Sequence, residues 1–255
     1  MKRWIESTLC ATVLWASSAW AGNKPMDLYL LIGQSNMAGR GEVEKQDLKA
    51  HPQVFTLNKA NEWVPAVDPI HFDKAIAGVG PGRAFGIAMA EQDPKVKIGL
   101  IPCAVGGTSI TYWVPGAEHS KTKTHPYDDM LVRLKVAQQS GTLKGIIWHQ
   151  GEADNKRRSK YMERLTELIE RLRTEAGDPE LPFVAGLLEM DDRDGKEPRA
   201  INAVIAKLPD VVAHTAVASS EGLVTKDGTH FESASAREMG RRFAEKMIEL
   251  QAAKK

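Results

Sequence analysis

The stretch Asp27-Leu28-Tyr29-Leu30-Leu31-Ile32-Gly33-Gln34-Ser35-Asn36-Met37-Ala38-Gly39 decides the fold of this chain. Its apolar run carries no charge after Asp27, which is typical of a strand buried on both faces of a parallel sheet. Glycine ends the run, and Ser35 follows almost at once. Because ligands of parallel α/β sheets bind at the carboxyl ends of the strands, Ser35 is expected at the reactive edge. Residues 36–39 are predicted to begin a helix whose free N–H groups would face developing negative charge.

Further apolar segments alternate with amphipathic ones along the rest of the chain. Strands are predicted over 96–103, 145–149, 182–188 and 211–217. Helices are predicted over 83–92, around 130–137, and over 156–175, 199–207 and 232–251. This alternation predicts a parallel sheet of about five strands with helices on both faces. The region 40–82, with several prolines and glycines, is expected to be a long irregular loop that shapes a site.

The first 21 residues have the pattern of a secretory signal peptide. Met1-Lys2-Arg3 is followed by a mostly apolar stretch to Trp15 and then by Ala19-Trp20-Ala21, a small-residue cleavage site. The apolar stretch is too short for a membrane anchor. We therefore expect an exported protein, periplasmic or extracellular, whose residues 22–255 form a single domain.

Charge and cysteine content narrow the class of protein further. The chain has a net charge of +1, and removal of the signal with Lys2, Arg3 and Glu6 leaves zero. The charges are scattered rather than gathered in a basic stripe, so no nucleic-acid partner is expected. Cys10 would leave with the signal, and Cys103 alone could form no internal disulfide. Buried cysteine is commonly inert, so Cys103 is not favoured as a nucleophile.

A base for Ser35 is found near the other end of the chain. His230 closes Asp227-Gly228-Thr229-His230, between the last predicted strand and the last helix. A tight turn over this spacing lets the Asp227 carboxylate reach one ring nitrogen while the other faces Ser35. The alternative is an ordinary surface turn in which Asp227 or Thr229 caps the last helix.

Two more strand ends carry groups that could stabilise an oxyanion. Gly106-Gly107 would supply a backbone N–H, and Gln150 a side-chain amide. Taken singly, the glycines also fit a tight turn and Gln150 a loop hydrogen bond. Several suitable groups at separate strand ends favour a catalytic site.

Four motifs follow one another along the chain: Gly33-Gln34-Ser35-Asn36-Met37; Gly106-Gly107-Thr108-Ser109-Ile110 with Trp113; Trp148-His149-Gln150-Gly151-Glu152; and Asp227-Gly228-Thr229-His230-Phe231. Together they resemble the carbohydrate acetylesterases of the SGNH hydrolase superfamily, nearest to the sialate O-acetylesterase-like group, carbohydrate esterase family 6. The resemblance spans nearly all of residues 22–255. It implies a three-layer αβα fold similar to flavodoxin.

The resemblance also implies roles for individual residues. Ser35 would be the nucleophile, His230 the base and Asp227 the orienting acid. The oxyanion hole would use the N–H groups of Ser35 and Gly107 and the amide of Gln150, where the wider superfamily usually has asparagine. Glu152 would support the site, although it also competes with Asp227 for the role of acid.

The resulting hypothesis is a serine esterase that removes O-acetyl groups from carbohydrate, such as acetylated xylan or sialic acid, through an acetyl-serine intermediate and without metal or organic cofactor. Two alternatives stay open. One is a non-catalytic carbohydrate-binding protein on the same scaffold, and the other is a hydrolase of lipid or thioester acyl groups.

Several side chains near the motifs allow two interpretations. His149 with Glu152, or Glu152 with Asp154, could suggest a metal, but no third ligand stands at a recognisable spacing, and a hydrogen-bonded core histidine is favoured for His149. Aromatic residues in predicted loops could stack on sugar rings or pack in the core. These residues are Trp63, Tyr112 and Trp113.

Overall fold

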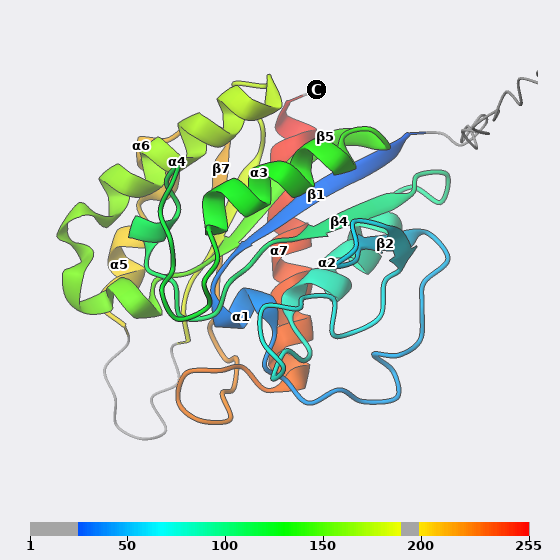
Figure 1. Cartoon of the computed structure of the whole chain (residues 1–255), viewed down its shortest axis with the longest axis horizontal. Helices are drawn as coiled ribbons and strands as arrows, with labels where there is room; N and C mark the ends of the chain where they lie inside the picture. The colour runs from blue at the N-terminus through cyan, green and yellow to red at the C-terminus, as the bar shows by residue number, and fades with distance from the viewer. Residues whose placement is uncertain (1–24, 190–198, 255) are drawn as a thin grey trace, which may run out of the picture.

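The apolar run that opens the chain's described part forms the middle of a mixed sheet in the computed structural model, which describes residues 25–189 and 199–254 (Figure 1). The strands are β1 (Met26–Gly33), β2 (Val54–Leu57), β3 (Trp63–Pro65), β4 (Ile98–Pro102), β5 (Gly141–His149), β6 (Phe183–Gly186) and β7 (Thr215–Ala218). The helices are α1 (Ser35–Ala38), α2 (Pro81–Ala90), α3 (Pro126–Ala137), α4 (Tyr161–Ala176), α5 (Asn202–Ile205), α6 (Leu208–Val211) and α7 (Ser233–Ala253), with 3-10 helices η1 (Ile110–Tyr112) and η2 (Glu152–Lys160).

The sheet order is β3-β2-β4-β1-β5-β6-β7, and every neighbouring pair is parallel except β2 with β3. The five strands predicted from the sequence are β4-β1-β5-β6-β7 in space, which is the 2-1-3-4-5 order of flavodoxin-like folds. Strand β1 is the point at which the order reverses, since β4 lies on one side and β5 on the other. Ligands of such folds bind beyond the carboxyl ends of the strands at this point.

The sheet has seven strands in the described part of the chain rather than the five expected. The additional pair, β2 and β3, forms an antiparallel edge hairpin within 40–82, the region predicted to be irregular. These strands have only four and three residues. Runs this short leave almost no alternation to recognise, and Pro65 at the edge argued against a strand.

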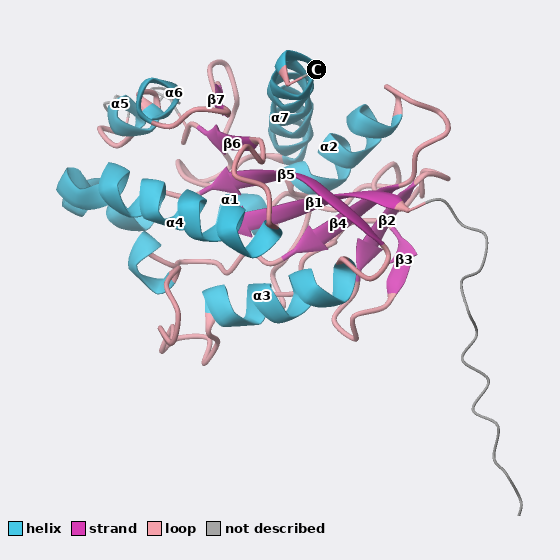
Figure 2. Ribbon diagram, turned by 90° about the horizontal axis from the view of Figure 1, so that it is seen from above, coloured by secondary structure: helices cyan, strands magenta, loops and turns pink. Residues whose placement is uncertain are grey.

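Helices cover both faces of the sheet, so the domain has three layers (Figure 2). Helices α3 and α4 pack on one face around a core that includes Trp113, Trp148 and Leu168. Helices α2 and α7 pack on the other face, with Tyr29 and Phe85 in the core. Strand β1 serves both layers because alternate side chains point to opposite faces and both faces are buried. The predicted α/β class and three-layer architecture are confirmed.

Some helix boundaries differ from the sequence prediction. The helix expected over 156–175 is η2 followed by α4, because the apolar stripe that packs on the sheet begins only at Tyr161. The helix expected over 199–207 includes the short α5, and part of the strand expected over 211–217 is the end of α6. Residues 1–21, the predicted signal peptide, lie outside the described residues. No helix in the described ranges is long and apolar enough to span a membrane.

Candidate active site

Ser35 lies at the carboxyl end of β1, where the strand turns abruptly into α1. Gly33 makes this turn possible: it has a φ of +130°, and a Cβ there would lie 2.2 Å from the carbonyl oxygen of His149. The Gln34 N–H then donates to the same carbonyl at 2.9 Å. Helix α1 ends after a single turn at Gly39, whose φ is +87°. The nucleophile predicted from the sequence is therefore held at the edge between β1 and β5.

The histidine predicted as its base is in hydrogen-bond range of Ser35. His230 Nε2 lies 3.1 Å from Ser35 Oγ, and His230 Nδ1 lies 2.8 Å from Asp227 Oδ2. The other carboxylate oxygen, Asp227 Oδ1, accepts from the backbone N–H groups of Thr229 and His230 at 3.1 and 2.7 Å. The turn thus fixes the carboxylate, and the carboxylate fixes the ring.

The Asp227 carboxylate remains ionised over a wide pH range. Burial by itself would raise its pKa, but the hydrogen bonds from the His230 side chain and backbone outweigh this effect and lower the pKa below the usual value. An ionised Asp227 accepts from Nδ1–H and leaves Nε2 free to accept the Ser35 proton.

Asn36, which sequence reasoning did not single out, holds the histidine loop on both sides of His230. Its Nδ2 donates to the carbonyl of Thr229 at 2.9 Å, and its Oδ1 accepts from the N–H of Phe231 at 3.1 Å. Nδ2 also donates to Glu152 Oε1 at 2.7 Å. Within the described part of the chain, His230 Nδ1 is hydrogen-bonded to Asp227, and Glu152 forms no hydrogen bond or ion pair with His230. Glu152 instead anchors the asparagine that holds the loop.

A second anchor of the histidine loop comes from Arg199. Its guanidinium donates to Thr229 Oγ1 at 3.0 Å and forms an ion pair with Glu189. Burial, and then the negative charge of Glu152, raise the pKa of Glu189 to about 7. Hydrogen bonds from Asn36 and from Arg199 therefore both hold the Asp227–His230 turn.

Gln150 differs from the sequence prediction. Its side chain is completely buried, and Nε2 donates to Asp154 Oδ2 at 2.6 Å, with Thr108 O at 3.0 Å and Gln34 Oε1 at 3.2 Å also in range. An amide nitrogen has only two hydrogens, so these acceptors occupy both. Gln150 in this structure connects three loops and presents no free donor to a substrate.

Asp154 organises the same region, although the sequence suggested it only as part of a weak metal pattern. Its carboxylate accepts from Ser109 Oγ at 2.6 Å, from the Ile110 N–H at 2.8 Å and from Gln150. This buried carboxylate therefore fixes the loop after β4 to the loop after β5. No cluster of three or more metal-ligating side chains occurs within 25–189 and 199–254.

The glycine pair after β4 lies beside the nucleophile loop. The Val105 N–H donates to the Gly33 carbonyl at 3.0 Å, and Thr108 is held by Gln150. Gly107, between them, has a φ of +86°, and the place that its Cβ would occupy is open. No described residue accepts from the backbone N–H groups of Ser35 and Gly107. Both N–H groups are therefore available to a ligand.

The remaining side chains weighed from the sequence are structural. His149 is fully buried and donates through Nε2 to the Leu187 carbonyl, and burial lowers its pKa. Burial raises the pKa of the Cys103 thiol to about 11. Trp113 is also fully buried, with its ring edge-on to Trp148 at 5.3 Å, which makes it a core residue.

Two other aromatic residues that could have stacked on a sugar ring, Trp63 and Tyr112, pack against other side chains of the protein. Trp63 is part of β3 rather than of a loop and packs against the core. The Tyr112 ring packs edge-on against His119 at 5.0 Å. Neither contact ties these rings to the nucleophile.

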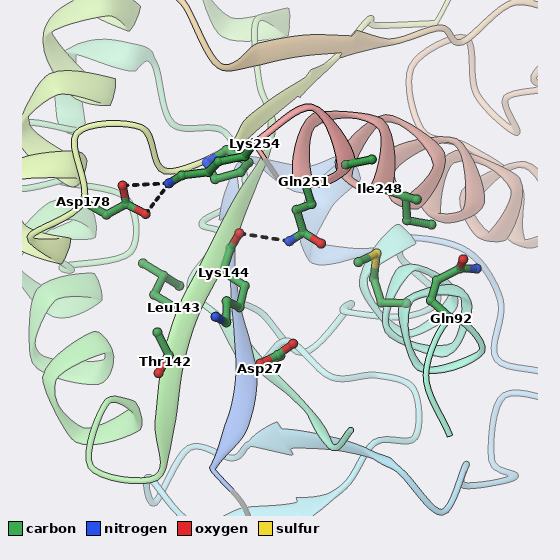
Figure 3. A pocket seen from close by; sticks show the side chains of 12 residues that line it. Asp27, Gln92, Thr142, Leu143, Lys144, Asp178, Ile248, Gln251 and Lys254 are labelled. Carbon is green, nitrogen blue, oxygen red and sulfur yellow. Dashed lines mark hydrogen bonds and ion pairs between the residues drawn. The ribbon is translucent and has the colours of Figure 1, made fainter. Parts of the chain in front are cut away.

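A cavity of about 580 Å³ lies at the opposite edge of the sheet, beside the starts of β1 and β5 (Figure 3). Two contacts occupy polar groups of its lining: Lys254 pairs with Asp178 at 2.9 Å, and Gln251 donates to the backbone carbonyl of Lys144 at 3.1 Å. No nucleophile and base face each other there. The candidate site is the one at the carboxyl edge.

At the carboxyl edge of this three-layer fold, hydrogen bonds join a serine, a histidine and an aspartate, which is the arrangement that serine hydrolases use. The family described as carbohydrate esterase, sialic acid-specific acetylesterase matches residues 25–249, and the chain belongs to this family. It is thus a carboxylic ester hydrolase that acts on carbohydrates, as the sequence resemblance predicted.

Known relatives agree with this assignment. The chain is 33% identical over 184 residues to a probable carbohydrate esterase of Arabidopsis thaliana, covering 63% of this chain and 68% of that protein. The solved structure of an Arabidopsis thaliana protein superposes with a TM-score of 0.74 and 26% identity, over 89% of this chain and 99% of the other. Two further structures share the fold: NanS, with a TM-score of 0.74 and 16% identity over 91% and 99% of the chains, and a carbohydrate acetylesterase from Xanthomonas citri, with 0.70 and 22% over 89% and 57%.

Proposed function

We propose that this esterase removes O-acetyl groups from a carbohydrate through an acetyl-serine intermediate, with Ser35 as nucleophile, His230 as base and Asp227 as the acid that orients it. The observation that carries the proposal is the 3.1 Å approach of His230 Nε2 to Ser35 Oγ, with Asp227 on the opposite ring nitrogen. This continuous chain of hydrogen bonds is what a serine needs to act as a nucleophile near neutral pH.

The reaction proceeds in two halves. Ser35 Oγ attacks the acetyl carbonyl carbon while its proton passes to His230 Nε2. The bond between that carbon and the sugar oxygen then breaks, and the sugar oxygen takes the proton from His230. In the second half, water attacks the acetyl-serine and gives a proton to His230, and acetate leaves as Ser35 recovers its proton.

The negative charge on the tetrahedral intermediate requires donors that are free before substrate arrives. We assign this role to the backbone N–H groups of Ser35 and Gly107, for which the described structure offers no internal acceptor. Gln150, whose amide hydrogens are already taken, is assigned to holding the loops that carry these donors.

Replacing Ser35 with alanine tests the nucleophile. Turnover of an aryl acetate by Ser35→Ala is expected to fall by about a thousandfold or more with an unchanged melting temperature, because only the attacking oxygen is lost. The matched control is Ser219→Ala, which removes an exposed hydroxyl that accepts from the Glu221 N–H and forms no hydrogen bond with Ser35, Asp227 or His230. Mass spectrometry of rapidly quenched wild-type enzyme should detect one acetyl group on the peptide that contains Ser35. Full activity of Ser35→Ala would eliminate the mechanism.

The acyl group and the sugar are tested separately. If the enzyme is specific for acetyl groups, its rates on aryl esters should fall as the acyl chain lengthens. It should also release acetate from acetylated xylan or from acetylated sialic acid. Rates that rise with chain length would instead indicate a lipid or thioester acyl hydrolase. Binding of the sugar without acetate release would indicate a carbohydrate-binding protein.

We also propose that the protein is exported, because residues 1–21 have the charge and hydrophobicity pattern of a signal peptide. Mass spectrometry of the protein produced from the full-length sequence should find Gly22 at the mature N-terminus. A mature protein that begins well before Gly22 would contradict this proposal.

A further inference from the structure

Gly106 is held on both sides by side chains from a distant segment, through its N–H and through the carbonyl of the peptide that joins it to Gly107. Lys74 Nζ donates to the Gly106 carbonyl at 2.9 Å, and Asp73 Oδ2 accepts from the Gly106 N–H at 2.8 Å. Both residues belong to the region between α1 and α2, more than thirty positions before the glycines in the chain. Two adjacent polar groups of the glycine loop are therefore held by two adjacent residues of another loop.

Asp73 is itself rigidly placed. Its carboxylate forms a two-point ion pair with Arg40, with distances of 2.7 and 3.3 Å, and the side chains are only 1% and 4% exposed. Arg40 follows directly after Gly39, which ends the helix that carries Ser35. A buried, two-point charged contact is among the more rigid arrangements that side chains make. Asp73 and Lys74 are thereby positioned relative to the nucleophile as well as to the glycine loop.

The geometry of the peptide unit transmits the effect of Lys74 to the next N–H. The only cis peptide bond within the described residues precedes Pro69, so the Gly106–Gly107 bond is trans. In a planar trans peptide the carbonyl and the following N–H point in opposite directions. Fixing the Gly106 oxygen on Lys74 therefore fixes the direction of the Gly107 N–H. An ammonium on the carbonyl also polarises the peptide and makes that N–H a stronger donor.

We propose that Lys74 is a positioning residue for the oxyanion hole, acting through the Gly106 carbonyl to orient and strengthen the Gly107 N–H. The inference rests on the proposed function, since it concerns the charge formed when Ser35 attacks. Apart from its two chain neighbours, no atom lies within 4 Å of the place that a Cβ of Gly107 would occupy, so packing on that side does not hold the residue. Without an external anchor this peptide could rotate, and an oriented donor is what stabilises the transition state.

The test compares Lys74→Met, which keeps the length but removes the donor, with Lys74→Arg, which retains a cationic donor. The control is Lys135→Met, an exposed lysine on α3 away from the site. For an aryl acetate, Lys74→Met is expected to lower kcat about tenfold with KM changed less than twofold, because the contact acts on the transition state. Lys74→Arg should recover most of the loss, and Lys135→Met should match the wild type.

A second readout separates positioning from a general structural role. Phenylboronic acid forms a tetrahedral anion on a catalytic serine, so its inhibition constant should weaken in Lys74→Met by about the same factor as kcat/KM, with an unchanged melting temperature. Equal kcat and equal boronate inhibition in Lys74→Met and wild type would overturn the inference. A change in KM alone would overturn it too, because Lys74 would then act in substrate binding. If wild-type activity does not depend on Ser35, the proposed function itself fails, which is a distinct result.

Discussion

At the scale of single residues, the site depends on which carboxylate acts on His230. Asp227 contacts the imidazole directly, whereas Glu152 contacts Asn36, which in turn holds the backbone on either side of the imidazole. One carboxylate therefore sets the tautomer and orientation of the ring. The other acts on the position of the loop through Asn36.

Separate replacement of these two carboxylates should give unequal losses. Asp227→Asn is expected to lower kcat about a thousandfold, because an amide donor facing Nδ1 favours the wrong tautomer. Glu152→Gln is expected to lower it at most about tenfold, because the glutamine oxygen can still accept from Asn36. Steady-state kinetics on an aryl acetate measure both. A larger loss in Glu152→Gln would reverse the assignment of the acid.

At the scale of elements, the turn from β1 into α1 is the point of greatest backbone constraint. Gly33 pairs with His149 of β5 and has a positive φ, so the strand can end against its neighbour only without a side chain. Gly177, which ends α4, also has a positive φ of 68°, but no other residue lies within 4 Å of the place its Cβ would occupy. A side chain at either position would be strained by the positive φ, but only a side chain at Gly33 would also clash with a neighbouring strand.

Alanine at these two positions should have different costs. Gly33→Ala is expected to lower the free energy of unfolding by roughly 3 kcal/mol, because the strain of an unfavourable φ adds to a clash with β5. Gly177→Ala should cost about 1 kcal/mol from the left-handed conformation alone. Urea denaturation followed by circular dichroism measures both. Equal losses would show that the contact with His149 does not matter.

At the scale of the whole molecule, two buried groups between α1 and α2, Asp68 and His71, make the stability of the fold depend on pH in opposite directions. Asp68 is buried with an unpaired Oδ1, and burial raises its pKa to about 7. The folded state then binds more protons than the unfolded state between about pH 4 and 7, so this group lowers stability as the pH rises through that range. His71 is buried too, and burial lowers its pKa to about 4. Its contribution has the opposite sign, since stability is lost as the pH falls from about 6.5 to 4.

Replacing Asp68 with asparagine tests how much the Asp68 carboxyl group contributes to the pH dependence of stability. The stability of Asp68→Asn relative to the wild type is expected to increase between pH 4 and 7, by on the order of 4 kcal/mol, and to stay constant above that range. Urea denaturation at a series of pH values gives this difference. A relative stability that does not change with pH would mean that Asp68 is ionised in the folded state at its ordinary pKa.

Five strands and the major helices could be predicted because burial on both faces, or on one helix face, leaves a direct record in the order of apolar residues. The pair β2 and β3 could not be predicted, since three or four residues carry too little pattern. Asp227 and His230 stand three positions apart, and a tight turn joins them whatever the rest of the chain does. That local geometry is why the pair was recognisable from the sequence.

The order of residues along the chain was enough to infer the class of fold, the family and the approach of Ser35, Asp227 and His230 to one another at the carboxyl edge of the sheet. The contacts of the folded chain were needed to see that the Gln150 amide hydrogens are used within the protein, that Glu152 supports the site through Asn36, and that Lys74 holds the Gly106 carbonyl. The contacts of Asn36 join residues 116 to 195 positions apart. A hydrogen bond between such distant groups requires a distance correct to a few tenths of an ångström and a suitable angle. The periodicity of apolar residues along the chain carries no information about either.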